Sequence, residues 1–165
     1  MPTPTAPPPA GLVAVDIDAA SFDGAGGFLE AERTAAVRDL LAQNRFEPGG
    51  RTGTFRLKMA VVEQKLVLDV SDDGAAPLAR HILSLRPLSR VIRDYFIVCE
   101  SYREAVDQAS PARIEAIDMG RRGLHDEGAT VLRDRLAGKI EMDHATARRL
   151  FTLVCALNWR IRGQR

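Results

Sequence analysis

This sequence has little net charge and few cysteines. Its 165 residues include 23 lysines and arginines and 22 acidic residues, which gives a formal net charge of +1. Such a balance argues against a partner attracted by the charge of the whole molecule, so any nucleic-acid contact would have to be local. The two cysteines, Cys99 and Cys155, lie in apolar helical patterns without CxxC spacing. We therefore predict two small buried thiols in a reducing interior and no disulfide framework.

Long hydrophobic runs and a secretion signal are also missing. The densest apolar runs, YFIVC and LFTLVCAL, are much too short to span a bilayer. No N-terminal stretch combines a basic segment with an apolar core, which is the pattern of a signal peptide. We expect a cytoplasmic protein with no membrane partner.

Recognisable catalytic and cofactor motifs are absent as well. The three histidines, His81, His125 and His144, have neither HExxH nor paired spacing, so we predict no metal site. The stretch GAGG at 24–27 lacks the spacing of a phosphate-binding loop and favours a flexible connection. No Ser-His-Asp or Cys-His arrangement has local support. These absences predict no cofactor and leave open whether the protein is an enzyme.

The chain has the length of one domain with a short tail. The first ten residues, MPTPTAPPPA, are half proline and therefore lack the amide donors that helices and sheets need. This composition predicts a disordered tail over residues 1–10. We expect residues 11–165 to form a single α+β domain, which at this size buries roughly two thirds of its unfolded surface.

The N-terminal half predicts a small sheet with one helix in its first crossover. After a strand at LVAVDID, the stretch FLEAERTAAVRDLLAQN has a helical pattern that ends near Asn44. Its predicted apolar face consists of Phe28, Ala31, Ala35, Val37 and Leu41. Residues 54–62, TFRLKMAVV, alternate apolar and polar side chains, and short turns lead on to LVLDV and LARHILSL. Consecutive strands with short turns pair as neighbours. The order β-α-β-β-β therefore predicts a mainly antiparallel sheet.

Three helices are predicted in the C-terminal half. After Pro87, apolar residues recur at steps of three and four, which predicts a centrally buried helix. Ser110 followed by Pro111 signals the start of a helix that reaches about Leu136. Asp143 is a second cap, before the apolar stretch HATARRLFTLVCALNWRIR. A helix this apolar packs against several elements or against a second subunit, so we expect self-association through the C-terminal helices.

Four stretches resemble a known family. They are RDYFIVCESYREAV, SPARIEAIDMGRRGLHDEGATVLRDRLAGKIEMD, TARRLFTLVCALN and, in the middle of the chain, LVLDVSDDGAAP. They are similar to the uncharacterised protein family UPF0262, small alphaproteobacterial proteins with no established activity. The resemblance covers about residues 11–158 and implies a bacterial cytoplasmic protein. It implies no catalytic residues, because none are assigned for the family.

The stretch IDMGRRGLHDEG, residues 117–128, gathers the most chemistry in the chain. It holds three glycines within nine residues, and each costs a helix about 1 kcal/mol relative to alanine. Either a neighbouring backbone approaches closely, or the helix breaks at Gly120 or Gly123. Helical spacing places Arg121 on the core side, where a guanidinium must find a carboxylate, carbonyls or a bound anion.

Two hypotheses account for this cluster. In the first, Arg121 pairs with Asp118 or with a carboxylate elsewhere, and the polar arc is a solvated helix face with ion pairs. In the second, the cluster is the anion pocket of a metabolite-binding protein or small enzyme, in which His125 titrates near neutrality. The ligand-binding residues in the second hypothesis are Arg121, Arg122, His125, Asp118, Tyr95 and Tyr102.

The C-terminus offers a third class of function. From Ala145 onward there are five arginines and no acidic residue. Arg160, Arg162 and Arg165 with Trp159 could contact RNA phosphates and stack on a base. Arginines in a last helical turn also complement the helix dipole. Our leading expectation is a non-enzymatic cytoplasmic binding or regulatory module that acts through protein contacts, ahead of metabolite binding and RNA binding.

Overall fold

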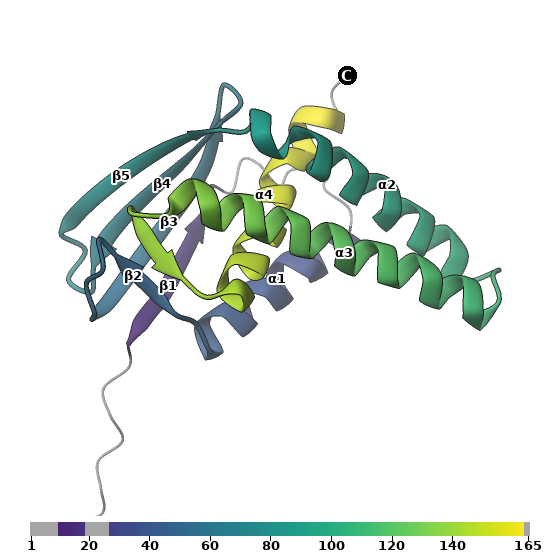
Figure 1. Cartoon of the computed structure of the whole chain (residues 1–165), viewed down its shortest axis with the longest axis horizontal. Helices are drawn as coiled ribbons and strands as arrows, with labels where there is room; N and C mark the ends of the chain where they lie inside the picture. Colours follow the sequence, from purple (N-terminus) through teal and green to yellow (C-terminus); the bar gives the residue numbers. More distant parts are fainter. Residues whose placement is uncertain (1–9, 19–26, 164–165) are drawn as a thin grey trace, which may run out of the picture.

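The computed structural model describes residues 10–18 and 27–163 (Figure 1). The tail predicted for residues 1–10 lies outside the described residues except for Ala10, and the predicted GAGG connection lies outside them except for Gly27. The described residues form a four-stranded sheet, a two-stranded sheet and four α-helices, so the α+β prediction is confirmed.

The main sheet has the strand order β1-β3-β4-β5. Its strands are β1 (Gly11–Ile17), β3 (Thr54–Val62), β4 (Lys65–Asp72) and β5 (Pro77–Ser84). The last three form an antiparallel meander, whereas β1 pairs parallel to β3 because helix α1 (Gly27–Ala42) carries the chain back across the sheet. The sheet is mainly antiparallel as predicted, and one parallel pair makes it mixed.

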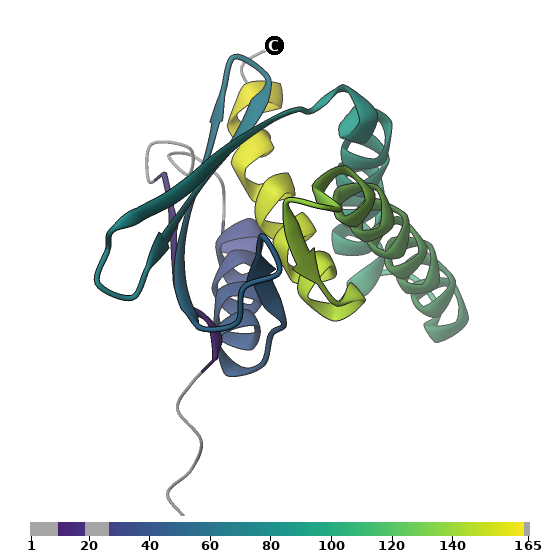
Figure 2. The same ribbon diagram turned by 60° about the vertical axis from the view of Figure 1, so that its left-hand side comes forward.

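One face of this sheet is apolar and carries all the helices. Phe55, Leu57 and Met59 of β3 are buried, while Arg56 and Lys58 between them are exposed. Figure 2 shows the helices gathered on a single side of the sheet. The period-2 pattern of β3 therefore determines which face is covered.

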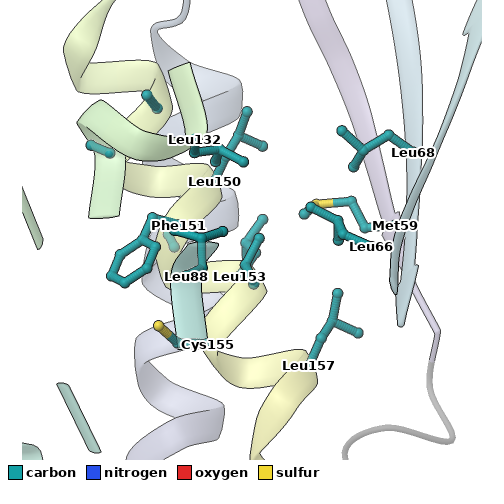
Figure 3. Close-up of a cluster of buried hydrophobic side chains, with 14 of the residues drawn as sticks. Met59, Leu66, Leu68, Leu88, Leu132, Leu150, Phe151, Leu153, Cys155 and Leu157 are labelled. Atoms are coloured by element: carbon teal, nitrogen blue, oxygen red, sulfur yellow. The ribbon is translucent and has the colours of Figure 1, made fainter. Parts of the chain in front are cut away.

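Helix α4 (His144–Gly163) occupies the centre of the molecule. It lies between the sheet and the pair formed by α2 (Ser89–Val106) and α3 (Pro111–Leu136), with α1 alongside (Figures 1 and 2). Figure 3 shows Leu150, Leu153 and Leu157 of α4 facing leucines and a methionine of the sheet. Every residue from 151 to 157 is buried. The apolar sequence of α4 is thus covered by its own chain, and so are both cysteines, which are free thiols.

The predicted starts of α3 and α4 are confirmed by their caps. The backbone N–H of Arg113 donates to Ser110 Oγ at 3.3 Å, and that of Thr146 donates to Asp143 Oδ1 at 2.9 Å. Helix α3 runs unbroken through Gly120 and Gly123, so the alternative of a helix break is wrong. A helix of 26 residues can therefore include these glycines, although each lowers its stability relative to alanine.

Three short elements and the orientation of α1 differ from expectation. The second sheet pairs β2 (Phe46–Pro48) with β6 (Ile140–Met142), and the 3-10 helix η2 (Arg86–Leu88) precedes α2. Three-residue elements are too short to show a periodic pattern. In α1, Ala36 and Leu40 are buried, whereas Ala31 and Leu41 are exposed. Val37 of the predicted face packs against the core, so the prediction is right there and wrong at Ala31 and Leu41. Adjacent leucines leave the orientation of the helix to tertiary packing.

Candidate functional site

Arg121 lies partly buried on α3 and is held from two sides. Its Nη2 donates to Asp118 Oδ1 at 2.7 Å, and its Nη1 lies 3.4 Å from Glu32 Oε1 of α1. The guanidinium carbon lies 5.4 Å from the centre of the Tyr102 ring, within cation–π range. The prediction that Arg121 pairs with Asp118 is confirmed, and Glu32 is a second carboxylate that sequence reasoning did not identify.

Asp118 links two neighbouring arginines. Arg122 Nη2 lies 3.0 Å from Asp118 Oδ2, and the Arg122 side chain is otherwise well exposed. The hydrogen bond from Arg121 is the main reason that the pKa of Asp118 is lowered. Both oxygens of Asp118 accept from arginines of its own helix, and Glu32 supplies a second negative charge. The two arginines and two carboxylates therefore form a neutral ion-pair group rather than an open anion site.

His125 lies one turn further along α3 in a different environment. Its Nε2 lies 2.7 Å from Thr152 Oγ1 of α4, and its ring stacks on Tyr95 with centroids 5.0 Å apart. Burial, followed by repulsion from Arg148 and Arg121, lowers the pKa of His125 to about 4. The imidazole is therefore neutral at pH 7, and the expectation that it titrates near neutrality was wrong, because the helix pair removes it from water.

The proton of this pair can be assigned from the hydrogen-bond network. The hydroxyl of Thr152 donates to the backbone carbonyl oxygen of Arg148 at 3.2 Å. A hydroxyl has a single proton to donate, so His125 Nε2–H is the donor to Thr152 Oγ1. Nδ1 of His125 is then an acceptor, and it has no hydrogen-bond partner among the described residues.

The two tyrosines of the predicted pocket have different surroundings. Tyr95 is buried to 1% exposure, and its hydroxyl reaches no nitrogen or oxygen partner in the described part of the chain. The pKa of Tyr95 is raised, first by burial and then by the adjacent Cys99. Tyr102 is partly exposed and covers Arg121. Tyr95 is thus a core residue that stacks on His125, and Tyr102 packs against the guanidinium of Arg121.

A cleft of about 250 Å³ opens between α1, α3 and α4. Of the six residues predicted to bind a ligand, His125 alone lines this cleft. The other polar residues that line it are Glu32 and Asp39 of α1 with Arg148, Arg149 and Thr152 of α4. Sequence reasoning had assigned both of these arginines to the basic C-terminus. Their three- and four-residue spacing from Ala145 and Thr152 indicates one helix face, but nothing local pairs that face with α1.

Both arginines of the cleft are anchored. Arg148 Nε lies 3.3 Å from Asp126 Oδ1, and the same oxygen lies 3.1 Å from His144 Nε2. Arg149 Nη1 donates to the carbonyl oxygen of Gln43 at 3.0 Å, just past the end of α1. A guanidinium has five N–H donors, so each arginine keeps further donors for a ligand.

The outer face of α3 has a second unusual feature. Over three turns a strip of small and apolar residues is exposed, flanked by the charged side chains of Arg113, Glu115 and Arg122; the strip consists of Ala112, Ala116, Met119, Gly120 and Gly123. The Met119 side chain is 65% exposed. A Cβ atom added at Gly120 or Gly123 would meet nothing within 4 Å. No packing partner within the described chain therefore explains these two glycines.

The predicted nucleic-acid-binding residues at the C-terminus lie largely outside the description. Arg165 lies outside the described residues, and α4 includes Trp159, Arg160 and Arg162, whose side chains are also outside the description. Among the described residues there is no group of three or more metal-ligating side chains. No helix in the described ranges is long and apolar enough to cross a membrane.

Comparison with known proteins identifies a family. The model of the uncharacterised protein family UPF0262 matches residues 10–160. The UPF0262 protein of Azorhizobium caulinodans is 52% identical over 157 residues, covering 93% of this chain and 97% of the relative. A UPF0262 protein of Rhizobium etli is 56% identical over 133 residues, covering 80% of this chain and 85% of the relative. No solved structure matches significantly. With a family model spanning nearly its whole length and relatives at this identity, the chain belongs to UPF0262.

Proposed function

We propose that this protein is a non-enzymatic cytoplasmic binding module that acts through protein contacts, and that the partner on the outer face of α3 is a second copy of itself. The observation that carries this proposal is the pair of exposed glycines, Gly120 and Gly123, inside a 26-residue helix. Two buried free thiols agree with a reducing compartment.

The glycines are costly where nothing offsets them. Each lowers helix stability by about 1 kcal/mol relative to alanine. At Gly128 of the same helix an added Cβ would overlap the Phe151 ring, so close packing inside the chain explains that glycine. At Gly120 and Gly123 alanine would fit without any contact. A second helix that approaches this bare backbone closely would give these two glycines the same purpose.

An antiparallel pairing of two α3 helices is self-complementary. A two-fold axis near Gly120 would place the protruding Met119 of each copy against the flat glycine surface of the other. Arg113 and Glu127 are each seven residues from Gly120, so the same axis brings Arg113 of one copy beside Glu127 of the other. Within the described chain Arg113 has no ion-pair partner, and Glu127 contacts Arg90 at the edge of the face. Parallel pairing would instead place like charges together.

The anion-pocket alternative around Arg121 has less support. That guanidinium already faces Asp118, Glu32 and Tyr102, and the cleft nearby is lined by other arginines. Self-association through α4 also has little support, because its apolar residues are covered by the sheet and by the other helices. Among the predicted C-terminal helices, α3 has the best-suited surface.

Sedimentation equilibrium over a wide range of concentration tests this proposal. We expect the wild type to dimerise, and Met119→Glu and Gly123→Leu each to weaken dimerisation roughly thirtyfold or more, as for residues at the centre of an interface. An added Cβ at Gly123 meets nothing within 4 Å among the described residues, so we expect Gly123→Leu to fold, and circular dichroism of the variant checks this.

Ile97→Glu is the matched control. Ile97 is 57% exposed on α2 and does not belong to the α3 face, so this variant should dimerise like the wild type. A wild type that stays monomeric at every concentration contradicts the proposal. A dimer that Met119→Glu and Gly123→Leu leave unchanged would place the interface elsewhere and reject the α3 pairing.

A further inference from the structure

The cleft between α1, α3 and α4 has two walls of opposite charge. Glu32 and Asp39 stand on α1, and Arg148 and Arg149 stand on α4, which runs beside α1 (Figures 1 and 2). Glu32 and Asp39 are seven residues apart on one face of α1, and Arg148 and Arg149 follow Ala145 by three and four residues on α4. The formal charges of these four residues cancel. A ligand with only one charge would therefore be attracted by one wall and repelled by the other.

The charges behind the walls keep this separation. From α3, Arg121 contacts Glu32 of the acidic wall, and Asp126 contacts Arg148 of the basic wall. Each contact uses part of the hydrogen-bonding capacity of its partner, because a carboxylate accepts up to four hydrogen bonds and a guanidinium donates five. The walls are thus positioned by ion pairs and still have groups that can bind a ligand.

His125, which lines the cleft, adds an acceptor. His125 donates through Nε2 to Thr152, which leaves the Nδ1 lone pair without a partner among the described residues. A neutral imidazole nitrogen of this kind binds a donor such as an ammonium group and not an anion. It therefore complements the acidic wall rather than the basic one.

Small side chains create the space. Ala35, Ala36 and Ala145 line the cleft between the charged residues, where larger apolar side chains would let α1 and α4 pack directly. A volume of about 250 Å³ is below the range of about 300–1,000 Å³ typical for drug-sized ligands. The cleft is therefore suited to a ligand of only a few non-hydrogen atoms.

We propose that this cleft binds a small zwitterionic metabolite that carries one ammonium and one carboxylate group. The ammonium group is held by Glu32, Asp39 and His125, and the carboxylate group by Arg148 and Arg149. This inference is independent of dimerisation, because none of these residues lies on the outer face of α3.

Calorimetric titration and thermal unfolding with simple probes test the proposal. The probes are three zwitterions of increasing length, glycine, β-alanine and γ-aminobutyrate, with acetate, methylammonium and inorganic phosphate as singly functional controls. We expect one of the zwitterions to bind at millimolar concentration and to raise the melting temperature, since a ligand of the native state stabilises it. It should bind at least about tenfold more tightly than acetate or methylammonium.

Two variants locate the binding site. Asp39→Asn removes a charge from an exposed position, and Ala145→Leu fills the cleft without changing its charge; both positions tolerate substitution because they face solvent. Each should weaken binding of the zwitterion by about tenfold or more with little change in unliganded stability. Asp134→Asn, an exposed substitution in the last turn of α3, is the matched control and should bind like the wild type.

Three outcomes would overturn the proposal. Equal binding of acetate or phosphate would make the cleft an anion site. Binding that Ala145→Leu leaves unchanged would place the ligand elsewhere. The absence of binding by all three zwitterions would show that the charged walls serve only to hold α1 against α4.

Discussion

Gly128 and the pair Gly120 and Gly123 lie on the same helix in opposite surroundings. Gly128 faces inward, where an added Cβ would overlap the ring of Phe151. The other two face outward, where an added Cβ would touch nothing. The same residue type, with the same cost to the helix, is thus explained by tertiary packing in one place and by nothing within the described chain in the other. A glycine in a helix is informative only when its neighbours are known.

The two sides of α3 also differ in the surroundings of their charged and polar residues. On the inner side, Arg121 and His125 are partly buried, and each contacts a partner from another helix. On the outer side a strip of small and apolar residues is exposed between charged side chains such as Arg113 and Arg122. An ordinary surface helix has polar residues at such solvent-facing positions. The difference is the main physical reason to expect a contact on the outer face.

The largest expected effect on stability concerns the contact between Gly128, on the inner side of α3, and Phe151. Phe151→Ala should lower the free energy of unfolding by about 3–5 kcal/mol, because it empties the centre of the core. It should also change the effect of Gly128→Ala on stability. In the wild type, the added methyl group overpacks the core and should lower the free energy of unfolding by about 1–3 kcal/mol. In the Phe151→Ala background the added methyl should be neutral or stabilising. Urea unfolding of the four proteins in this double-mutant cycle measures the coupling, and additive effects would contradict the assigned contact.

A pH titration gives the next largest effect. The pKa of His125 is about 4 in the native state against 6.5 when unperturbed, so the unfolded chain binds more protons between these values. Stability from this residue is fully present above pH 6.5 and is lost as the pH falls toward 4. The loss corresponds to roughly 3 kcal/mol.

Urea unfolding from pH 7 to pH 4 measures this loss, and His125→Gln provides the control. The variant keeps a side-chain donor for Thr152 but has no proton to gain, so its stability should fall less steeply over this range. Equal slopes for wild type and variant would mean that His125 is not the group responsible.

The smallest expected effect concerns the two exposed glycines on the outer side of α3. Gly120→Ala and Gly123→Ala should each raise the stability of the monomer by about 1 kcal/mol, because alanine favours the helix and meets no neighbour. The measurement is best made in the Met119→Glu background, which is expected to be monomeric. A loss of stability would show that a part of the chain outside the described residues packs against this face.

Local rules predicted much of this fold. The start of α3 at Pro111 and its end at Leu136 follow from a cap signal and a helical period, and strand β3 follows from strict alternation. Both depend on residues within a few positions of each other, so they can be read from one stretch of sequence. The prediction that Arg121 needs a carboxylate is of the same kind, because the penalty for an unpaired buried charge holds in any fold.

The candidate cleft could not be predicted in this way. His125 was identified by its neighbours in sequence, but its actual partners, Thr152 and Tyr95, come from other helices. The second carboxylate on Arg121 is Glu32, 89 residues away. The local sequence of Arg148 and Arg149 indicates only a basic terminus, whereas in the fold α1 lies beside them. These contacts depend on how helices cross, which no local pattern specifies.

The sequence by itself determined where most helices and strands begin and end, which face of β3 is apolar, and that Arg121 must be paired. Only the tertiary structure decided that α4 is covered by its own chain, that α1 turns Leu40 inward and not Leu41, and that the charges of α1 and α4 face each other across a cleft. The physical reason is range: capping and periodicity act between residues a few positions apart, whereas burial and ion pairing are fixed by distant segments that meet only in the folded chain.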